Sequence, residues 1–186
     1  RHIAAQLGEK GIAMLDAPVS GGAQGAIDAT LAIMVGGEAN VVDRLRPLLA
    51  CLGQRVVHIG PNGAGQVAKA CNQMIMVAAI QAVAEAMRLA AAAGFDCARV
   101  KEALAGGSAA SRVLDVMGER MVRRNFAAGI EARLHHKDFG LVLEAARQCG
   151  MPVPLAAVVD QQLNVLMAQG WGADDTASLL RVLELL

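Results

Sequence analysis

Residues 64–93 read AGQVAKACNQMIMVAAIQAVAEAMRLAAAA, and Gly94 follows them directly. No proline interrupts this stretch, and Ala, Val, Ile and Met occupy nearly every face of a helix drawn through it. Such a helix spans about 45 Å at the standard rise per residue. The helix must be buried on most sides, and Gln81, Glu85 and Arg88 favour a buried helix over a membrane span.

The segments on either side of this helix differ in pattern. Before it, apolar spacing predicts strands at residues 12–19, 30–35 and 55–59 and helices at residues 3–10 and 41–52. Asn40 is the predicted N-cap of the second helix, and Pro47 inside it predicts a kink or a division into two short pieces. After it, further helices are predicted at residues 98–105, 111–122, 137–148, 154–169 and 174–185. We therefore expect an α/β part over residues 1–60 and an all-helical part over residues 61–186.

The composition excludes several classes of protein. Of the 186 residues, 55% are hydrophobic and only 2% are aromatic, so the core must be aliphatic, which favours packed helices. Lys and Arg number 17 and Asp and Glu number 17, with no basic patch, so we expect no nucleic-acid partner. Cys51, Cys71, Cys97 and Cys149 lie far apart, which indicates reduced, mostly buried thiols in a cytoplasmic protein.

Leu15-Asp-Ala-Pro-Val-Ser-Gly-Gly22 is a predicted strand that runs into a turn. Ser20 offers a hydroxyl, and Gly21 and Gly22 let backbone N–H groups approach a small anion because neither residue carries a Cβ. These three residues are therefore candidates for binding a carboxylate. A plain strand-ending turn, which Gly-Gly commonly marks, explains the same residues.

Lys69 lies in an apolar part of the long helix, with Asn72 and Gln73 on the same face one turn later. Apolar neighbours partly desolvate Lys69, which disfavours its charged form and favours proton exchange near neutral pH. Lys69 is thus a candidate general acid or base for a carbonyl substrate, and Asn72 a candidate for holding the substrate oxygen or orienting the ammonium. The alternative is a lysine whose stem covers apolar surface while its head reaches water.

Lys137 and Asp138 stand at the predicted start of a helix, where capping and surface residues are common. His135 and His136 precede them. Adjacent helix positions point in different directions, and no third ligand is spaced to join the two histidines. We therefore expect no metal site.

Three motifs occur in this chain in a specific order. They are Asp-Ala-Pro-Val-Ser-Gly-Gly at 16–22, Gly-Ala-Gly-Gln-Val-Ala-Lys-Ala-Cys-Asn-Gln at 63–73 and Leu-His-His-Lys-Asp at 134–138. Together they resemble the β-hydroxyacid dehydrogenase family, which includes the 3-hydroxyisobutyrate dehydrogenases, and the resemblance runs through essentially the whole chain. The stretches 26–37, 124–130 and 134–138 resemble the subgroup of tartronate semialdehyde (2-hydroxy-3-oxopropionate) reductases most.

The resemblance implies a Rossmann NAD(P)-binding domain joined by one long interdomain helix to an all-α C-terminal domain, with the active site in the cleft between them. Residues 1–60 then form an α/β remnant, the last strands of the Rossmann domain, and residues 61–186 the helical substrate and oligomerisation domain. The implied roles are substrate carboxylate binding for Ser20, Gly21 and Gly22, catalysis for Lys69 and substrate contact for Asn72. Lys137 and Asp138 are the implied cofactor-binding residues, with Asp138 supporting the far side of the cleft.

Two features depart from the family pattern. Ile130 stands where related reductases often carry an aromatic residue near the substrate, which implies a more open or differently selective pocket. No Gly-x-Gly-x-x-Gly loop follows a predicted strand, although the family places one near its N-terminus. We therefore expect the phosphate-binding loop for NAD or NADP to be absent from this chain. We also expect the isolated chain to be inactive and to bind dinucleotide weakly.

These inferences predict an NAD(P)-dependent oxidoreductase that interconverts a short 3-hydroxy acid and its 3-oxo acid. Tartronate semialdehyde and D-glycerate are the favoured pair, with Lys69 as general acid/base. A 3-hydroxyisobutyrate dehydrogenase or a glyoxylate or succinic semialdehyde reductase is the alternative within this class. A non-catalytic helical oligomerisation module or an inactive fragment is the alternative of another class. We expect a homo-oligomer formed through the helical domain, and no membrane partner.

Overall fold

The structure, a computed structural model, describes residues 1–185 of the chain. It divides into two compact units, Arg1–Asn72 (unit 1) and Gln73–Leu186 (unit 2). The boundary lies inside the long helix α4 (Ala64–Ala92). The assignment of separate roles to residues 1–60 and 61–186 stays a prediction.

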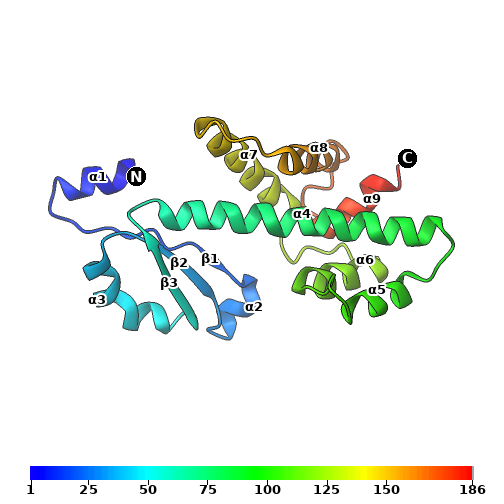
Figure 1. Ribbon diagram of the computed structural model, residues 1–186, viewed down its shortest axis with the longest axis horizontal. Coiled ribbons are helices and arrows are strands. Elements are labelled where there is room, and N and C mark those ends of the chain that lie inside the picture. Colours follow the sequence, from blue (N-terminus) through cyan, green and yellow to red (C-terminus); the bar gives the residue numbers. More distant parts are fainter. Residues whose placement is uncertain (186) are drawn as a thin grey trace. The chain divides into compact units, whose positions relative to one another are not determined.

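Unit 1 is built on a small sheet. Within the described residues, the sheet contains β1 (Val19–Ser20), β2 (Ala32–Gly36) and β3 (Arg55–Gly60), in that order. β1 pairs antiparallel with β2, whereas β2 pairs parallel with β3. The helices of this unit are α1 (His2–Gly8), α2 (Gly22–Ile27), α3 (Ala39–Ala50) and the first turns of α4. Figure 1 shows α3 beside the sheet, so β2, α3 and β3 form the strand–helix–strand crossover that parallel pairing requires.

The strand predicted over residues 12–19 is wrong for most of its length. Val19 alone of these residues lies in a strand, and Asp16 makes an isolated bridge with Gly36. Pro18 has no N–H to give to the ladder, so its pairing with Met34 keeps only the hydrogen bond from Met34 N to Pro18 O, at 3.0 Å, and the regular strand is confined to β1. The strands predicted at residues 30–35 and 55–59 are confirmed as β2 and β3.

Helix α3 differs from its prediction in two ways. It begins at Ala39 after Glu38, so the predicted N-cap, Asn40, is wrong and lies inside the first turn. Pro47 lies within one continuous helix rather than between two pieces. Because the proline is close to the helix end, the hydrogen bond that it removes is one of the last in the helix. The hydrophobic core of this unit is aliphatic and consists of Leu31, Ile33, Val35 and Val42.

Helix α4 confirms the prediction of one long helix, since it runs for 29 residues and is followed by Gly94 with a φ of +80°. Among the described residues it is the one helix long and apolar enough to cross a membrane by length and composition. Within unit 2, its residues Val77, Ile80 and Met87 are buried in the hydrophobic core. One face of α4 thus packs in the core, whereas Ile75 and Leu89 are 68% and 71% exposed, so the prediction that this helix is buried on most sides is wrong.

The regular elements of unit 2 are helices in the part that the structure describes, beside an isolated bridge between Glu131 and Asp175. Its elements after α4 are α5 (Cys97–Ala105), a π-helical turn η1 (Leu114–Gly118), α6 (Glu119–Val122), α7 (Ala132–Gln148), α8 (Pro154–Ala168), a 3₁₀ turn η2 (Thr176–Ser178) and α9 (Leu179–Leu183). Figure 1 shows α7 and α8 packed side by side. Phe139 from α7 and Leu163 and Leu166 from α8 are fully buried in the core they share with α4.

Three predictions need correction here. Helix α7 begins at Ala132, five residues before Lys137, so Lys137 and Asp138 lie inside a helix rather than at its start. The predicted helix over residues 174–185 is instead η2 followed by α9, because Asp175 caps a 3₁₀ turn through Ala177 N. The prediction of mostly buried cysteines is also wrong. Cys51, Cys71 and Cys149 are exposed, and Cys97 is half-buried.

A bidentate ion pair between Arg124 and Glu184 joins the segment after α6 to the segment after α9. Both guanidinium Nη atoms of Arg124 donate to the Glu184 carboxylate, at 2.7 and 2.9 Å. Arg124 has a φ of +52°, an uncommon value for a residue other than glycine. Hydrogen bonds from Arg124 lower the pKa of Glu184 below its ordinary value of 4.5. The pair therefore stabilises the folded state only while Glu184 is ionised.

The substitution Glu184→Gln tests this pair through its pH dependence. Because folding lowers the pKa of Glu184, the stabilisation is complete above the unfolded value of 4.5 and is lost as the pH falls through the folded value. The Arg124 side chain is 57% exposed. We therefore expect the substitution to lower the free energy of unfolding by about 1 kcal/mol or less near neutral pH, measured by urea denaturation.

At a pH below the folded pKa of Glu184, the same substitution is expected to have a much smaller effect. Glu144→Gln is the control, because Glu144 pairs with Arg147 on an exposed stretch of α7. A loss of stability that is equal at both pH values would contradict the role given to Glu184.

Candidate active site

The first group of candidate residues assembles inside unit 1. Lys69, near the start of α4, donates a hydrogen bond from Nζ to the backbone oxygen of Val19, at 2.9 Å. Val19 and Ser20 form β1, and Gly21 and Gly22 follow directly. The structure therefore places the Lys69 ammonium at the edge of the Ser20–Gly22 turn, although 50 residues separate Lys69 from Val19.

The turn itself requires glycine. Gly21 has a φ of +141° and Gly22 a φ of +65°, both in the region that L side chains rarely adopt. A Cβ on Gly21 would also lie 3.0 Å from Leu31 Cδ2. These glycine constraints are expected for a plain turn and for an anion-binding turn alike. The feature that favours anion binding is the Lys69 ammonium next to the turn. A carboxylate in this turn would lie beside a cation.

The start of α4 is fixed by the carboxylate of Asp16. Its Oδ1 accepts a hydrogen bond from Gly63 N at 2.6 Å, and its Oδ2 accepts one from Gln66 N at 3.1 Å. Asp16 thus caps α4 from a segment far away in the sequence. Because Lys69 follows within the next turn of the helix, the cap also places the Lys69 side chain.

The backbone around the Asp16 carboxylate is closely packed. A Cβ on Gly36 would lie 2.7 Å from both carboxylate oxygens. A Cβ on Gly65 would clash with the backbone oxygen of Met34. Glycine at these two positions is therefore what lets the helix start approach β2 and the carboxylate.

Asp16 also decides whether this helix start carries a dinucleotide phosphate site. The segment from Gly63 to Gly65 follows β3 and opens a helix, as a phosphate-binding glycine loop does. Its backbone amides at Gly63 and Gln66, however, already bind an internal carboxylate. This helix start does not fit a pyrophosphate, because the place of the anion is taken by Asp16.

The second group of candidate residues assembles inside unit 2. Asp138 Oδ2 accepts a hydrogen bond from Gln73 Nε2 at 2.6 Å, and Asp138 Oδ1 lies 3.1 Å from Lys137 Nζ. Gln73 is 5% exposed, whereas the Lys137 side chain is 66% exposed. Asp138 therefore holds α7 to α4 while Lys137 extends into solvent. An exposed ammonium of this kind fits contact with a polar group of a nicotinamide cofactor.

The remaining candidates are Asn72, His135 and His136. Asn72 is half-buried on α4, in the same helix as the candidate lysine. His135 is buried and its Nδ1 lies 2.6 Å from Thr176 Oγ1, whereas His136 Nε2 lies 2.7 Å from Asn164 Oδ1. The two histidines thus contact different elements. In the part of the chain that the structure describes, no three His, Cys, Asp or Glu side chains gather as metal ligands would.

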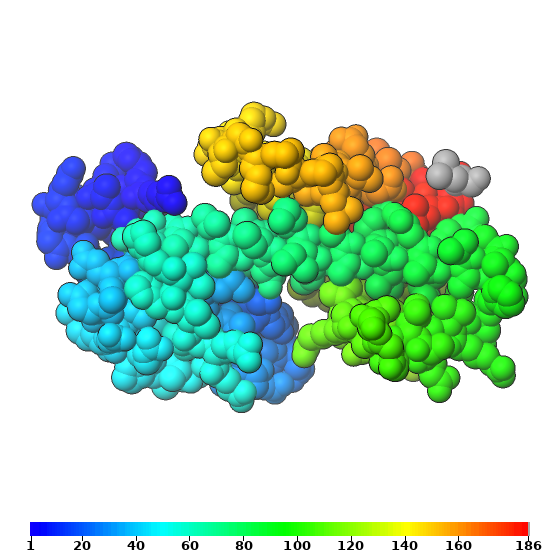
Figure 2. Space-filling view, in the orientation of Figure 1, coloured from blue at the N-terminus to red at the C-terminus, as the bar shows by residue number. Residues whose placement is uncertain are grey.

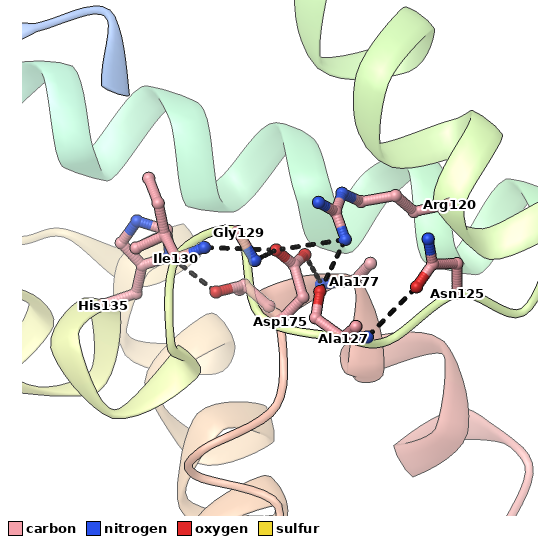
Figure 3. Close-up of polar contacts among 9 residues, drawn as sticks. Arg120, Asn125, Ala127, Gly129, Ile130, His135, Asp175 and Ala177 are labelled. Atoms are coloured by element: carbon pink, nitrogen blue, oxygen red, sulfur yellow. Dashed lines mark hydrogen bonds and ion pairs between the residues drawn. The ribbon is translucent and has the colours of Figure 1, made fainter. Parts of the chain in front are cut away.

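Sequence reasoning missed three residues of unit 2. Figure 3 shows Asp175 and Arg120 facing the turn at Gly129 and Ile130, just before α7. Nothing in the local pattern distinguishes Asp175 from an ordinary helix-capping aspartate. Gln73 lies on the predicted face of α4 but is not among the predicted site residues. Its position one helical turn after Lys69 is the sequence feature that could have identified it.

Two family models together cover most of the chain. A model described as the NAD-binding domain of NADP-dependent 3-hydroxyisobutyrate dehydrogenase matches residues 63–183. A model described as the NAD binding domain of 6-phosphogluconate dehydrogenase matches residues 1–60.

Known proteins resemble the chain along its whole length. The 2-hydroxy-3-oxopropionate reductase of Escherichia coli K12 is 43% identical over 186 residues, which is 100% of this chain and 64% of that protein. The NAD-dependent L-serine dehydrogenase of Pseudomonas aeruginosa is 38% identical over 94% of this chain and 61% of that protein. The crystal structure of a Salmonella typhimurium 3-hydroxyisobutyrate dehydrogenase superposes with a TM-score of 0.90 at 30% identity, covering 97% of this chain and 64% of that one. The chain thus spans less than two thirds of each of these proteins.

The substitution Asp16→Ala tests the cap on α4. It removes two hydrogen bonds from backbone amides at a helix start, so we expect a loss of about 1–3 kcal/mol in the free energy of unfolding, measured by urea denaturation. Asp28→Ala is the control, because the exposed Asp28 accepts a side-chain hydrogen bond from Gln24 at the surface. Equal losses for the two variants would show that the Asp16 carboxylate has no special role in fixing α4.

Proposed function

Because the chain belongs to the NADP-dependent 3-hydroxyisobutyrate dehydrogenase family, we propose that its whole protein is an NAD(P)-dependent oxidoreductase of short 3-hydroxy acids and their 3-oxo acids. The observation that carries the proposal is the 2.9 Å hydrogen bond from Lys69 Nζ to Val19 O, which sets a proton donor beside the Ser20–Gly22 turn. A carboxylate-binding turn with an adjacent ammonium suits a substrate whose two reacting ends are close together. In a three-carbon oxo acid, one carbon separates the carboxylate from the aldehyde.

In the proposed reaction, the substrate carboxylate binds at Ser20, Gly21 and Gly22. A bound NAD(P)H supplies the hydride for the aldehyde carbon. Lys69 gives its proton to the aldehyde oxygen as negative charge develops there, and takes a proton from the hydroxyl in the reverse direction. Asn72, one turn further along α4, holds the same oxygen.

For the cofactor we propose contacts from Lys137, with Asp138 holding Lys137 and α7 in place. The hydrogen bond from Gln73 and the contact with Lys137 support this role, because they fix both carboxylate oxygens of Asp138. The amides at the start of α4 bind Asp16, so we propose that the phosphates of the cofactor bind at a glycine loop elsewhere.

Tartronate semialdehyde, reduced to D-glycerate, is the substrate we propose first. The identity of 43% to the E. coli 2-hydroxy-3-oxopropionate reductase supports this choice, compared with 38% to the L-serine dehydrogenase and 38% to a 3-hydroxyisobutyrate dehydrogenase, both of P. aeruginosa. Methylmalonate semialdehyde, glyoxylate and succinic semialdehyde are the competing substrates. A cytoplasmic location, and the lack of nucleic-acid or membrane partners, stay predictions.

We further propose that the protein forms a homo-oligomer through unit 2. Ile75 on α4 and Leu155 on α8 are 68% and 64% exposed, and they line one groove with Gln81. Figure 2 shows α4 (green) and α8 (orange) side by side on this face. The buried Gln81 Oε1 has no hydrogen-bond partner among the described residues. A second copy covering this groove removes the apolar side chains from water and can supply a donor to Gln81.

The role of Lys69 is tested by Lys69→Met in the full-length protein, since methionine keeps the aliphatic stem without the ammonium. We expect kcat to fall about 10²- to 10⁴-fold, the usual contribution of general acid catalysis. NADH and NADPH oxidation is followed with the four aldehydes named above. Lys10→Met, at an exposed position after α1, is the control and is expected to retain wild-type turnover. Near-normal turnover of Lys69→Met would refute the proposed general acid.

The oligomer is tested by the double substitution Ile75→Asp and Leu155→Asp. Two carboxylates in an apolar contact repel each other across it and lose solvation, so we expect a smaller assembly in sedimentation velocity. Leu48→Asp, at a residue that is 63% exposed on α3, is the control. An unchanged sedimentation coefficient in the double variant would exclude this groove as the subunit contact.

A further inference from the structure

The side of α4 that faces away from the core of unit 2 carries an apolar stripe. Ile75 is 68% exposed and Leu89 is 71% exposed, and the exposed Ala82 lies midway between them in the sequence. Successive members of this set are seven residues apart, which is close to two helical turns, so all three lie along one side of the helix. Figure 2 shows part of α4 (green) uncovered at the surface. We name these three residues the α4 stripe, and such a stripe is typical of a helix that packs against a partner.

The groove between α4 and α8 runs beside this stripe. It is lined by Ile75, Ala78, Ala79 and Ala82 of α4 and by Leu155 of α8. Because three of these residues are alanines, a second helix can approach α4 closely here, at the separation of about 8–10 Å that packed helices have. The groove therefore fits an apolar helix.

The buried side chain of Gln81 is a second, independent feature of the groove. Gln81 is 4% exposed and lines the groove. Its Nε2 donates to Glu85 Oε1 at 2.8 Å, whereas its Oε1 accepts no hydrogen bond from the described residues. An amide nitrogen carries two hydrogens, so Nε2 can donate a second hydrogen bond. A second Gln81 in the opposite orientation supplies both an acceptor for that hydrogen and a donor for Oε1.

The spacing along the α4 stripe is symmetric about Ala82. Ile75 and Leu89 are each seven residues from it, in opposite directions. In an antiparallel pair of α4 helices centred on Ala82, Ile75 of each copy therefore faces Leu89 of the other copy. Gln81 is next to Ala82 in sequence, so the two Gln81 side chains lie near the axis. A two-fold interface has this property, because it uses the same surface of both copies.

Glu85 distinguishes a helix partner from a lipid surface. It is exposed, lines the groove and accepts the hydrogen bond from Gln81. An ionised carboxylate on an apolar helix face is costly in the hydrocarbon of a bilayer. In the antiparallel pair Glu85 instead faces Ala79 of the second copy, whose small side chain leaves the carboxylate open to water. A second copy is therefore the occupant that these residues favour.

We propose that α4 pairs antiparallel with α4 of a second copy about a two-fold axis at Ala82. The proposal rests on the homo-oligomer proposed above and adds its symmetry, its register and the polar groups at its centre. Those polar groups are the two Gln81 amides, and a single polar pair within an apolar helix contact fixes the register of the helices. Ile75 and Leu89 close the contact at both ends.

The first experiment places a cysteine at the axis of the full-length protein. In the background, serine replaces the exposed Cys51, Cys71 and Cys149. A disulfide forms when two Cα atoms lie about 4.4–6.8 Å apart. The variant Ala82→Cys is therefore expected to give a disulfide-linked dimer with oxidised glutathione, seen as a doubled mass on a non-reducing gel. Ala103→Cys, at an exposed position on α5, is the matched control and is expected to stay unlinked.

The orientation of the two helices is tested in the same background. Antiparallel pairing about Ala82 separates the two copies of position 75 by about 21 Å along the helix axis, and the two copies of position 89 by the same distance. The single variants Ile75→Cys and Leu89→Cys are therefore expected to stay unlinked. The double variant is expected to link, because each copy then presents both members of a facing pair.

A second measurement does not depend on disulfide chemistry. The substitution Ala82→Glu brings a carboxylate from each copy to the axis, and like charges that face each other oppose association. We expect the dimer dissociation constant from sedimentation velocity to rise about tenfold or more. Ala82 is exposed in the single chain, so the variant is expected to fold. Ala103→Glu is the control and is expected to keep the wild-type dissociation constant.

Linkage of Ala82→Cys and of the double variant, with both single variants unlinked, supports the proposal. Linkage of either single variant overturns it, as does an unlinked Ala82→Cys or an unchanged dissociation constant in Ala82→Glu, and the homo-oligomer itself then stands. A wild-type protein that sediments as a monomer overturns the homo-oligomer and this inference together. Binding of that monomer to phosphatidylcholine vesicles would assign the α4 stripe to a lipid surface instead.

Discussion

The carboxylate of Asp16 is the interaction on which unit 1 depends. It binds the amides of Gly63 and Gln66 at the start of α4, where the surrounding backbone leaves no room for further side chains. With the helix start fixed against β2, Lys69 reaches Val19 on β1. A loss of this cap would therefore affect the candidate site as well as stability.

Unit 2 uses the same physical device at a different place. Asp175 is a buried carboxylate that binds backbone amides, in this case at the turn before α7. A carboxylate binds several N–H groups more strongly than a neutral acceptor does, so it can hold irregular backbone that no helix or sheet would hold. In each unit the backbone held in this way leads to candidate functional residues, Lys69 in unit 1 and Lys137 in unit 2.

Much of the secondary structure follows from local pattern. The uninterrupted apolar stretch predicts α4, and short β-branched segments bounded by glycines predict β2 and β3. The predictions are wrong where a distant group replaces a local signal. The predicted start of α7 is five residues late, because the cap of this helix comes from Gly172 and Asp174 rather than from a neighbouring side chain. The strand predicted before β1 is reduced to an isolated bridge between Asp16 and Gly36, because Pro18 lacks the N–H that would complete the ladder between them and β1.

By itself, the sequence determined the family and the identities of the candidate residues, since motifs of fixed spacing carry that information without coordinates. The roles of Ser20, Gly21, Gly22, Lys69, Asn72, Lys137 and Asp138 stay predictions. Only the tertiary structure decided that the Lys69 ammonium lies beside the turn and that Asp16 occupies the anion-binding amides of α4. It also decided that Asp175 holds the turn before α7. These contacts join residues about 45 to 50 apart in the chain, and local sequence pattern has no means of encoding which distant amide a carboxylate will meet.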